Sequence, residues 1–304
     1  MSPNPERLAQ RSGWQALILY LRSLREGYWP LIKSLQTGLL LATGLAGFTS
    51  ARCPVSAMPT LLGLTGSLFL TISGSTVLNM YFDRDLDAKM ARTRSRPLPS
   101  GRLRPENGLR LGLLLSLLGL GWATLLSPLF ALVVFAGLIF DVGVYTIWLK
   151  RRSAWSIVWG GISGGMPILA GRALAIGHID WVGLLLALSV LCWIPTHILT
   201  FQMRYFEDYR RAGVPTFPSR FGFGATRLVI ALSSVLAAVA IGGAAVGIGM
   251  TWGYLRVLAV LSMGLFGLAI KALAQPSEIL HFGLFKYASL YMLSAMLLFV
   301  VEAM

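Results

Sequence analysis

Long apolar segments recur along this chain and restrict its fold more than any other feature. A helix needs roughly 20 residues to cross the hydrocarbon core of a bilayer, which is about 30 Å thick. The apolar runs are continuous rather than alternating, which favours helices over barrel strands because a helix satisfies its backbone polar groups within the segment. The sequence predicts an all-α, polytopic membrane helical bundle with about nine transmembrane helices, near residues 31–51, 59–80, 108–127, 129–149, 155–176, 180–201, 225–249, 251–274 and 282–303.

The composition excludes an ordinary soluble domain. Hydrophobic residues make up 56% of the 304 residues and charged residues only 12%, which is about half the charge of a typical soluble domain. Residues 1–30 are polar to amphipathic, so we expect a cytoplasmic N-terminal segment without a cleavable signal peptide, followed by a single transmembrane domain over residues 31–304. Cys53 and Cys192 stand in unrelated segments and indicate neither a disulfide framework nor a zinc site.

The basic residues fall almost entirely in alternate loops. With the predicted spans, 23 of the 26 Lys and Arg lie on the side of the N-terminus, and only Arg52, Arg172 and Arg256 lie on the other side. The positive-inside rule then places the N-terminus in the cytoplasm and the C-terminus outside. Topology therefore explains the formal net charge of +14, and we expect no nucleic-acid partner.

Acidic residues interrupt the same basic loops, where topology requires none. In the loop near residues 79–107, which closes the second span, Asn79, Asp83 and Asp87 follow one another at intervals of four. On a helix this spacing aligns two carboxylates and an amide along one face, about 5–6 Å apart. Neighbouring carboxylates repel unless a cation lies between them, and hard oxygen ligands that leave room for phosphates suit Mg²⁺. The alternative that spacing alone leaves open is an ordinary charged helix end held by nearby arginines.

The residues beside this face divide into two groups. Asp85 points away from it and is expected to be solvated or paired with Lys89, one turn on. Arg92, Arg94 and Arg96 follow at once. Cationic groups beside a metal-binding face are suited to an anion such as diphosphate.

A second acidic loop, near residues 202–224, follows the sixth predicted span on the same side of the membrane. Its segment RYFED faintly repeats MYFDR of the first loop, as a duplicated four-helix unit would. Asp208 is the best ligand candidate there, whereas Glu207 either assists it or neutralises Arg204 or Arg211. Two such loops facing each other across a bundle would hold one Mg²⁺-diphosphate between them.

Several longer motifs are familiar. Residues 79–98, NMYFDRDLDAKMARTRSRPL, join the Asn-aspartate pattern to a Met-x-Arg-Thr-x-x-Arg-Pro-Leu tail, and residues 143–152, GVYTIWLKRR, lead into a glycine-rich segment. WIPTH, residues 193–197, is followed by EDYRRAGVPTFP, residues 207–218, and Lys33 precedes the first apolar run. These motifs span most of the chain and resemble the UbiA superfamily of intramembrane prenyltransferases, and within it the protoheme IX farnesyltransferase (heme O synthase) branch.

The chain also departs from the pattern of that branch. Most departures replace residues on the acceptor side: Ser34, Leu35, Ile168, Arg172, Thr196 and Ile198. In addition, Arg204 stands four residues before Asp208, where other branches of the superfamily carry a second aspartate. The diphosphate end is therefore better preserved than the acceptor end.

The resemblance implies a complete reaction. The enzyme would bind farnesyl diphosphate, or another prenyl diphosphate, with its headgroup at the cytoplasmic face. Mg²⁺ would be held by Asp83, Asp87 and Asp208, with Asn79 orienting these ligands. The diphosphate oxygens would be held by four cations: Lys33, Arg92, Arg96 and Lys150. Loss of diphosphate creates an allylic cation, a dry pocket shields it, and the acceptor of that branch is heme b, which becomes heme O.

Three further residues are candidates for contact with the acceptor or the cation. For His197 the alternatives are the heme iron or a propionate, and a hydrogen bond to backbone freed by the adjacent proline. Tyr145 either stabilises the cation or bonds the diphosphate, or it is an interfacial tyrosine. Asp141 lies inside the fourth predicted span, where a carboxylate indicates function, by contact with the acceptor or with a buried cation. His178 and His281 fall in short connections and are expected at the surface.

Two other functions compete with heme O synthesis. A prenyltransferase acting on a quinone precursor, another tetrapyrrole or a lipid would share all the diphosphate residues. A secondary transporter would carry its ion-binding carboxylates near the midplane, whereas here only Asp141 lies clearly at depth. In each case we expect a multi-pass protein surrounded by membrane lipid, in the plasma (inner) membrane of a bacterium or the mitochondrial inner membrane of a eukaryote.

Overall fold

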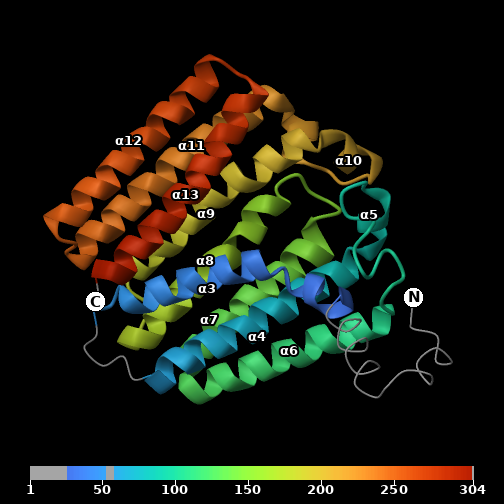
Figure 1. Ribbon diagram of the computed structural model, residues 1–304, viewed down its shortest axis with the longest axis horizontal. Coiled ribbons are helices and arrows are strands. Elements are labelled where there is room, and N and C mark those ends of the chain that lie inside the picture. Colours follow the sequence, from blue (N-terminus) through green and yellow to red (C-terminus); the bar gives the residue numbers. More distant parts are fainter. Residues whose placement is uncertain (1–25, 53–57, 303–304) are drawn as a thin grey trace, which may run out of the picture.

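Helices are the only regular elements in the part of the chain that the structure describes, which is residues 26–52 and 58–302 of a computed structural model (Figure 1). The predicted N-terminal segment, except for its last residues, and Cys53 lie outside this part. The labelled helices are α3 (Ser34–Thr49), α4 (Met58–Phe82), α5 (Arg84–Lys89), α6 (Pro105–Leu126), α7 (Pro128–Leu138), the π-helix η1 (Ile139–Leu149), α8 (Ser156–Ile176), α9 (Trp181–Arg204), α10 (Phe206–Arg211), α11 (Phe217–Ile248), α12 (Trp252–Ala274) and α13 (Glu278–Glu302).

Within the described residues, eight helical segments are long and apolar enough to cross a membrane. One of them, Glu26–Thr49, contains α3 and the helical turns before it, and another, Pro128–Leu149, consists of α7 and η1. The predicted span that is missing from these eight is the fifth, 155–176, which corresponds to α8, a helix of 21 residues that contains five glycines and packs against α3, α7 and α9. The prediction of an all-α polytopic bundle is confirmed, whereas the side of the membrane on which each terminus lies stays a prediction.

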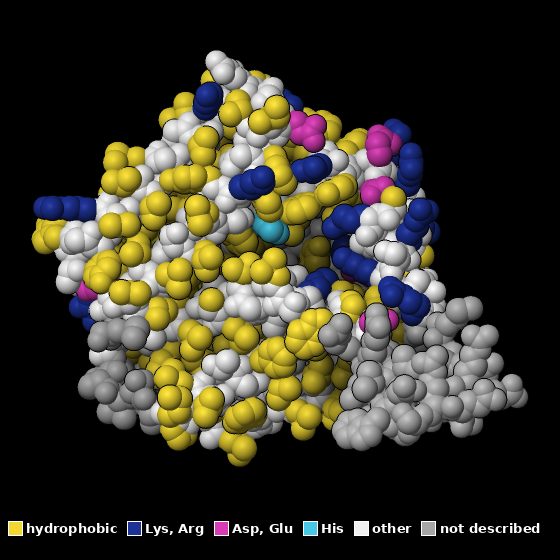
Figure 2. All heavy atoms as spheres, in the orientation of Figure 1, with side chains coloured by type: hydrophobic (Ala, Val, Ile, Leu, Met, Phe, Trp, Pro, Cys, Tyr) yellow, Lys and Arg dark blue, Asp and Glu magenta, His cyan; other side chains and the backbone are white. Residues whose placement is uncertain are grey.

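The outer surface of the bundle is apolar. On α6, Leu113, Leu117 and Leu125 are exposed, and α12 likewise exposes Val260 and Met263. Figure 2 shows hydrophobic side chains spread over the helices, while Lys and Arg gather beside α5 and α10. A monomeric soluble protein rarely exposes so much contiguous apolar surface. The chain is therefore an integral membrane protein whose charge is concentrated at one end of the helices.

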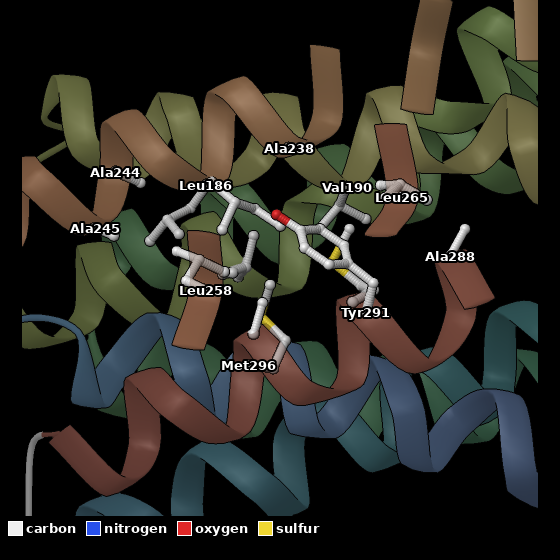
Figure 3. Close-up of a cluster of buried hydrophobic side chains, with 14 of the residues drawn as sticks. Leu186, Val190, Ala238, Ala244, Ala245, Leu258, Leu265, Ala288, Tyr291 and Met296 are labelled. Atoms are coloured by element: carbon white, nitrogen blue, oxygen red, sulfur yellow. The ribbon is translucent and has the colours of Figure 1, made fainter. Parts of the chain in front are cut away.

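The largest buried cluster lies where α9, α11, α12 and α13 meet. Figure 3 shows Leu186 and Val190 of α9 facing Leu258 of α12 and Met296 of α13. Tyr291, also on α13, is 1% exposed, and its hydroxyl lies 3.0 Å from the Ser262 hydroxyl. The buried phenol thus keeps a hydrogen-bond partner, as buried tyrosines usually do.

The backbones of α3 and α8 approach closely because glycines stand at their crossing. A Cβ atom on Gly47 would lie 2.0 Å from the carbonyl oxygen of Ile168, and one on Gly171 would lie 2.0 Å from that of Gly44. Small residues at such crossings let membrane helices pack backbone to backbone. This crossing holds α8 in the middle of the bundle, where its residues form part of the cavity described next.

Candidate functional site

Asn79, Asp83 and Asp87, here called the aspartate stripe, stay aligned although the helix that carries them is interrupted. The sequence predicts one helix from Asn79 to Asp87, but α4 ends at Phe82 and Asp83 has φ −91° and ψ 0° before α5 begins. The backbone hydrogen bonds nevertheless continue, from Asp83 N to Asn79 O at 2.9 Å and from Asp87 N to Asp83 O at 2.8 Å. The two carboxylates therefore keep their expected order, and both residues are only 6% exposed.

A cation holds each of these carboxylates. Lys150, just after η1, donates to Asp83 Oδ2, and an Arg96 guanidinium nitrogen lies 2.7 Å from Asp87 Oδ2. Burial raises the pKa of the Asp83 carboxyl, although Lys150 opposes the shift. The other oxygen, Asp83 Oδ1, is buried without a hydrogen-bond partner. An unsatisfied carboxylate oxygen inside a protein is an available ligand for a hard cation, so the donor set fits Mg²⁺.

Asp85 is held by a different partner from the one expected. It is exposed and points away from the stripe, as predicted, but it pairs with Arg151 rather than Lys89. The two Arg151 guanidinium nitrogens lie 2.7 and 2.6 Å from its carboxylate oxygens and lower the Asp85 pKa to about 2. Arg151 also donates to the Phe82 carbonyl at 2.7 Å, so this pair fastens the end of η1 to the end of α4.

Asn79 belongs to a hydrogen-bond network inside the bundle. Its Nδ2 donates to Asp141 Oδ2 at 2.7 Å, and its Oδ1 accepts from the Thr146 hydroxyl at 2.7 Å. The Thr146 hydroxyl also lies 2.9 Å from the Asp141 carbonyl oxygen, and Ser75 donates to the Asp141 carboxylate. Asp141 thus contacts an amide and a hydroxyl, and the network fixes the direction in which Asn79 points.

Sequence reasoning missed Thr146 and Ser75 for different reasons. Thr146 meets Asp141 because η1 is a π-helix, in which residues five apart stack on one another. An α-helical reading looks instead four residues on, at Tyr145. Ser75 lies one turn before Asn79 on α4, so the same four-residue spacing that links the aspartates, extended backwards, would have found it.

The two acidic loops pack against each other. Leu86 and Met90 of the first loop form a buried cluster with Ala212 and Val214 of the second. Arg92 bridges the loops as well, because its guanidinium carbon lies 5.1 Å from the centre of the Tyr205 ring. The expectation that the loops face each other agrees with these contacts.

The second loop does not complete a cluster of metal ligands in this structure. Asp208, on α10, is half-buried, and the described residues contain no group of three or more His, Cys, Asp or Glu placed to hold one ion. Glu207 pairs with Arg210 at 2.7 Å rather than with Arg204 or Arg211, because α10 sets residues three apart on one face. A metal role for Asp208 therefore stays a prediction.

A cavity of about 390 Å³ begins at Asn79, one helical turn before Asp83, and is lined by residues of α3, α4, α7, η1, α8 and α9. Five of its polar lining residues were predicted as site residues: Lys33, Asn79, Asp141, Tyr145 and His197. Along α4 the lining runs from Asn79 back to Leu68, which corresponds to about 16 Å at the rise of an α-helix. The remaining lining residues are mostly apolar, so one elongated cavity extends from a charged end into an apolar interior.

The charged end of the cavity collects cations from three parts of the chain. Lys33 has φ 48°, in the left-handed region, and interrupts the helix before α3. Arg96, Lys150, Asp141 and Asp87 all act on it electrostatically. The structure thus brings Lys33, Lys150 and Arg96 together, whereas Arg92 remains exposed on the loop above them.

Two rings border the cavity. Tyr145 lies under Lys150, whose Nζ is 5.5 Å from the ring centre. His197 stacks among aromatic rings, with the centre of the Phe285 ring 4.8 Å away, and its Nδ1 has no hydrogen-bond partner. That nitrogen therefore does not bond the backbone freed by Pro195. His178 is exposed as expected, but the surface prediction for His281 is wrong, because α13 begins at Glu278 and buries it.

Only two of the departures on the acceptor side lie at the cavity. Leu35 and Ile198 line it. Thr196 instead bonds Ser234 at 2.7 Å between α9 and α11, and Arg172 pairs with Asp180 at 2.7 Å. Thr196, Arg172 and the buried Ile168 therefore affect packing rather than the cavity wall.

These features define a class of protein: a membrane enzyme with an intramembrane cavity whose polar end combines buried carboxylates and cations. The sequence profile of the UbiA prenyltransferase family matches residues 40–297. The chain belongs to this family, and it is a prenyltransferase.

The relatives and solved structures agree. The chain is 43% identical over 206 residues to a protoheme IX farnesyltransferase of Korarchaeum cryptofilum, covering 68% of this chain and 69% of that protein. It is 36% identical over 276 residues to a protein of the same name from Desulforudis audaxviator, covering 89% and 86%.

Among solved structures, the fold resembles a digeranylgeranylglyceryl phosphate synthase with a TM-score of 0.76 at 18% identity, covering 93% of this chain and 98% of that one. It also resembles a UbiA homologue from Archaeoglobus fulgidus bound to DMAPP and Mg²⁺, with a TM-score of 0.66 at 13% identity, covering 90% and 99%.

Proposed function

We propose that this protein transfers a farnesyl group from farnesyl diphosphate to heme b in a Mg²⁺-dependent reaction, giving heme O. The observation that carries the proposal is the cavity whose polar end, at Lys33, Asn79 and Asp141, begins one helical turn from the cation-held Asp83 and continues into an apolar interior. Curated relatives at 36–47% identity carry the name protoheme IX farnesyltransferase, which supports the acceptor and the prenyl group. The A. fulgidus homologue bound to DMAPP and Mg²⁺ supports the metal and the diphosphate.

The charged end of the cavity is suited to hold the leaving group. Asp83 and Asp87, with Asp208 from the facing loop, would hold Mg²⁺, which when bound neutralises the departing diphosphate. Lys33, Lys150 and Arg96 lie around the same point and would bind the diphosphate oxygens. Arg92, on the loop above, would bind the headgroup from outside. Asn79, fixed by Asp141 and Thr146, would keep its amide directed at this end of the cavity.

The interior of the cavity is suited to the second half of the reaction. When the carbon–oxygen bond breaks, diphosphate keeps the electron pair and the farnesyl carbon becomes an allylic cation. Apolar walls exclude bulk water from it, and the Tyr145 ring presents a face that favours positive charge. The heme vinyl group supplies the electrons of the new carbon–carbon bond, and water then adds to the resulting cation and releases a proton.

His197 is our candidate for contact with the heme. It lines the cavity with an unpartnered Nδ1 and is stacked among aromatic rings that would pack against a porphyrin. A neutral imidazole nitrogen with no protein partner is available to a metal or to a propionic acid group. Leu35 and Ile198, the two unusual residues at the cavity, would contact the acceptor from opposite helices.

An acceptor panel tests the proposal. The purified protein in detergent is incubated with Mg²⁺, farnesyl diphosphate and either heme b, a quinone precursor or another tetrapyrrole, and the products are identified by mass spectrometry. We expect a hydroxyethylfarnesyl adduct of heme b alone. Transfer to a different acceptor with no farnesylated heme would overturn the heme assignment and keep the prenyltransferase chemistry.

A further inference from the structure

A second cavity lies near the start of α13, apart from the one described above. It has a volume of about 220 Å³ and is enclosed by the end of α9, the beginning of α11 and the first turn of α13. Its polar wall is formed by Arg204, Arg227, Glu278 and His281. None of its lining residues lines the larger cavity.

Three side-chain nitrogens of this cavity's lining residues lack hydrogen-bond partners. His281 is only 5% exposed, yet neither of its ring nitrogens has a hydrogen-bond partner. Arg227 Nε is also buried without a partner, and Arg227 lies close enough to His281 to act on it electrostatically. Most buried polar atoms in proteins are hydrogen-bonded. A neutral imidazole donates from one ring nitrogen, so His281 and Arg227 Nε together leave two donors unpartnered around one cavity, which indicates a ligand that accepts hydrogen bonds.

The charge of the cavity defines that ligand further. In the described part of the chain, neither Arg204 nor Arg227 forms an ion pair, although Glu278 lines the same wall. Two guanidinium groups against one carboxylate leave a net positive wall. The Arg204 guanidinium carbon lies 4.4 Å from the centre of the Phe282 ring, which holds it at the rim. The planar guanidinium group of arginine presents paired N–H donors whose spacing matches that of phosphate oxygens.

The position of the cavity among membrane helices indicates where the phosphate comes from. It lies at the same end of the bundle as α10, and Figure 2 shows basic side chains over the upper parts of α9 and α13. Basic pockets between transmembrane helices at this level bind anionic lipid headgroups. We propose that this cavity binds a phosphate group, supplied by the headgroup of an anionic phospholipid or by free phosphate. The proposal does not depend on the acceptor of the prenyl group.

Lipid nanodiscs provide the test. The full chain is reconstituted in phosphatidylcholine alone, in phosphatidylcholine with phosphatidylglycerol, and in phosphatidylcholine with inorganic phosphate or diphosphate in the buffer, and its thermal unfolding is measured. The variants are Arg227→Gln and Arg204→Gln. The Arg204 side chain is exposed, so its replacement should not disturb folding. Arg220→Gln is the matched control, because Arg220 is exposed on α11 and does not line the cavity.

We expect phosphatidylglycerol to raise the unfolding temperature of the wild type and Arg220→Gln, and both cavity variants to lose most of the rise and roughly tenfold in lipid affinity. A rise with free phosphate only, lost in the same variants, would support the site with the other source. If the cavity variants respond like Arg220→Gln to every addition, the proposal is wrong. Binding of heme b is measured in the same variants, and the proposal is equally wrong if that binding alone is weakened, because the cavity then holds the acceptor's carboxylates.

Discussion

At the scale of single residues, three aspartates within five positions have three different environments. Asp83 is buried, forms an ion pair with Lys150 and has one carboxylate oxygen without a hydrogen-bond partner. Asp87 is buried and forms an ion pair with Arg96, whereas Asp85 is exposed and forms an ion pair with Arg151. The four-residue spacing was sufficient to separate Asp85 from the other two. It did not reveal their partners, because these come from η1 and from a loop whose path depends on the packing of the whole bundle.

The buried Asp83 and the exposed Asp85 predict different results for the same substitution to asparagine. Asp83→Asn removes a metal ligand and should lower prenyl transfer by more than about 100-fold, the upper end of what a residue that only orients a metal ligand costs. Asp85→Asn, on the same short segment, should keep most of the activity because it only loosens Arg151. Both are measured as kcat/KM with farnesyl diphosphate, and equal losses in the two variants would remove the distinction.

The Thr146 hydroxyl should act on catalysis through Asn79. Thr146→Val leaves the buried Asn79 Oδ1 without a donor and frees its amide to turn, so kcat should fall by about tenfold and the free energy of unfolding by about 1–3 kcal/mol. Thr146→Ser keeps the hydroxyl and should restore kcat to near the wild-type value. Turnover by Thr146→Val at the wild-type rate would show that Asn79 needs no such support.

At the scale of elements, the sequence was most informative where helices are long and apolar. All nine predicted spans correspond to observed helices, because hydrocarbon thickness sets their length. Shorter departures were not predictable from propensity. The π-helical turns of η1, the break at Asp83 and the left-handed Lys33 all stand where helix ends adapt to neighbouring chain. These departures lie at the candidate site, and irregular helical geometry is often found at functional sites.

The crossing of α3 and α8 predicts a strong effect of one methyl group. Gly47→Ala would push a Cβ atom into the backbone of α8 and should lower the free energy of unfolding by about 1–3 kcal/mol. Gly38→Ala, on the same helix, meets nothing within 4 Å and should be neutral or stabilising by up to about 1 kcal/mol. Unfolding in detergent measures both, and a neutral Gly47→Ala would mean that the helices separate easily.

The ion pair between the end of α8 and the start of α9 predicts a dependence on pH. The Arg172 guanidinium holds the pKa of Asp180 below its usual value. The Asp180 carboxylate therefore adds stability that is present above its unfolded pKa of about 3.9 and is lost as the pH falls through the lower folded value. Asp180→Asn should be less stable than the wild type at neutral pH, and the gap should narrow under acid. Unfolding temperatures across this range measure the gap, and a constant gap would contradict the assignment.

At the scale of the whole molecule, charge and cavity are arranged along one direction. The two acidic loops pack together above a cavity that descends between the helices, so a diphosphate and its apolar tail have one continuous place to lie. The charged end of the cavity was predictable from the sequence, because the residues that form it belong to short, continuous sequence motifs. The shape of the apolar end was not predictable, since it depends on how six helical elements between residues 33 and 198 pack together.

In the function proposed above, one site both cleaves the diphosphate and transfers the prenyl group. The most direct measurement is a single turnover with Mg²⁺, farnesyl diphosphate and heme b, in which released diphosphate and farnesylated heme are quantified together. We predict equal amounts of the two products in the wild type and neither in Asp83→Asn. Diphosphate released without farnesylated heme would show that this site does not couple cleavage to transfer, and farnesylated heme formed by Asp83→Asn at the wild-type rate would show that Asp83 is not needed for it.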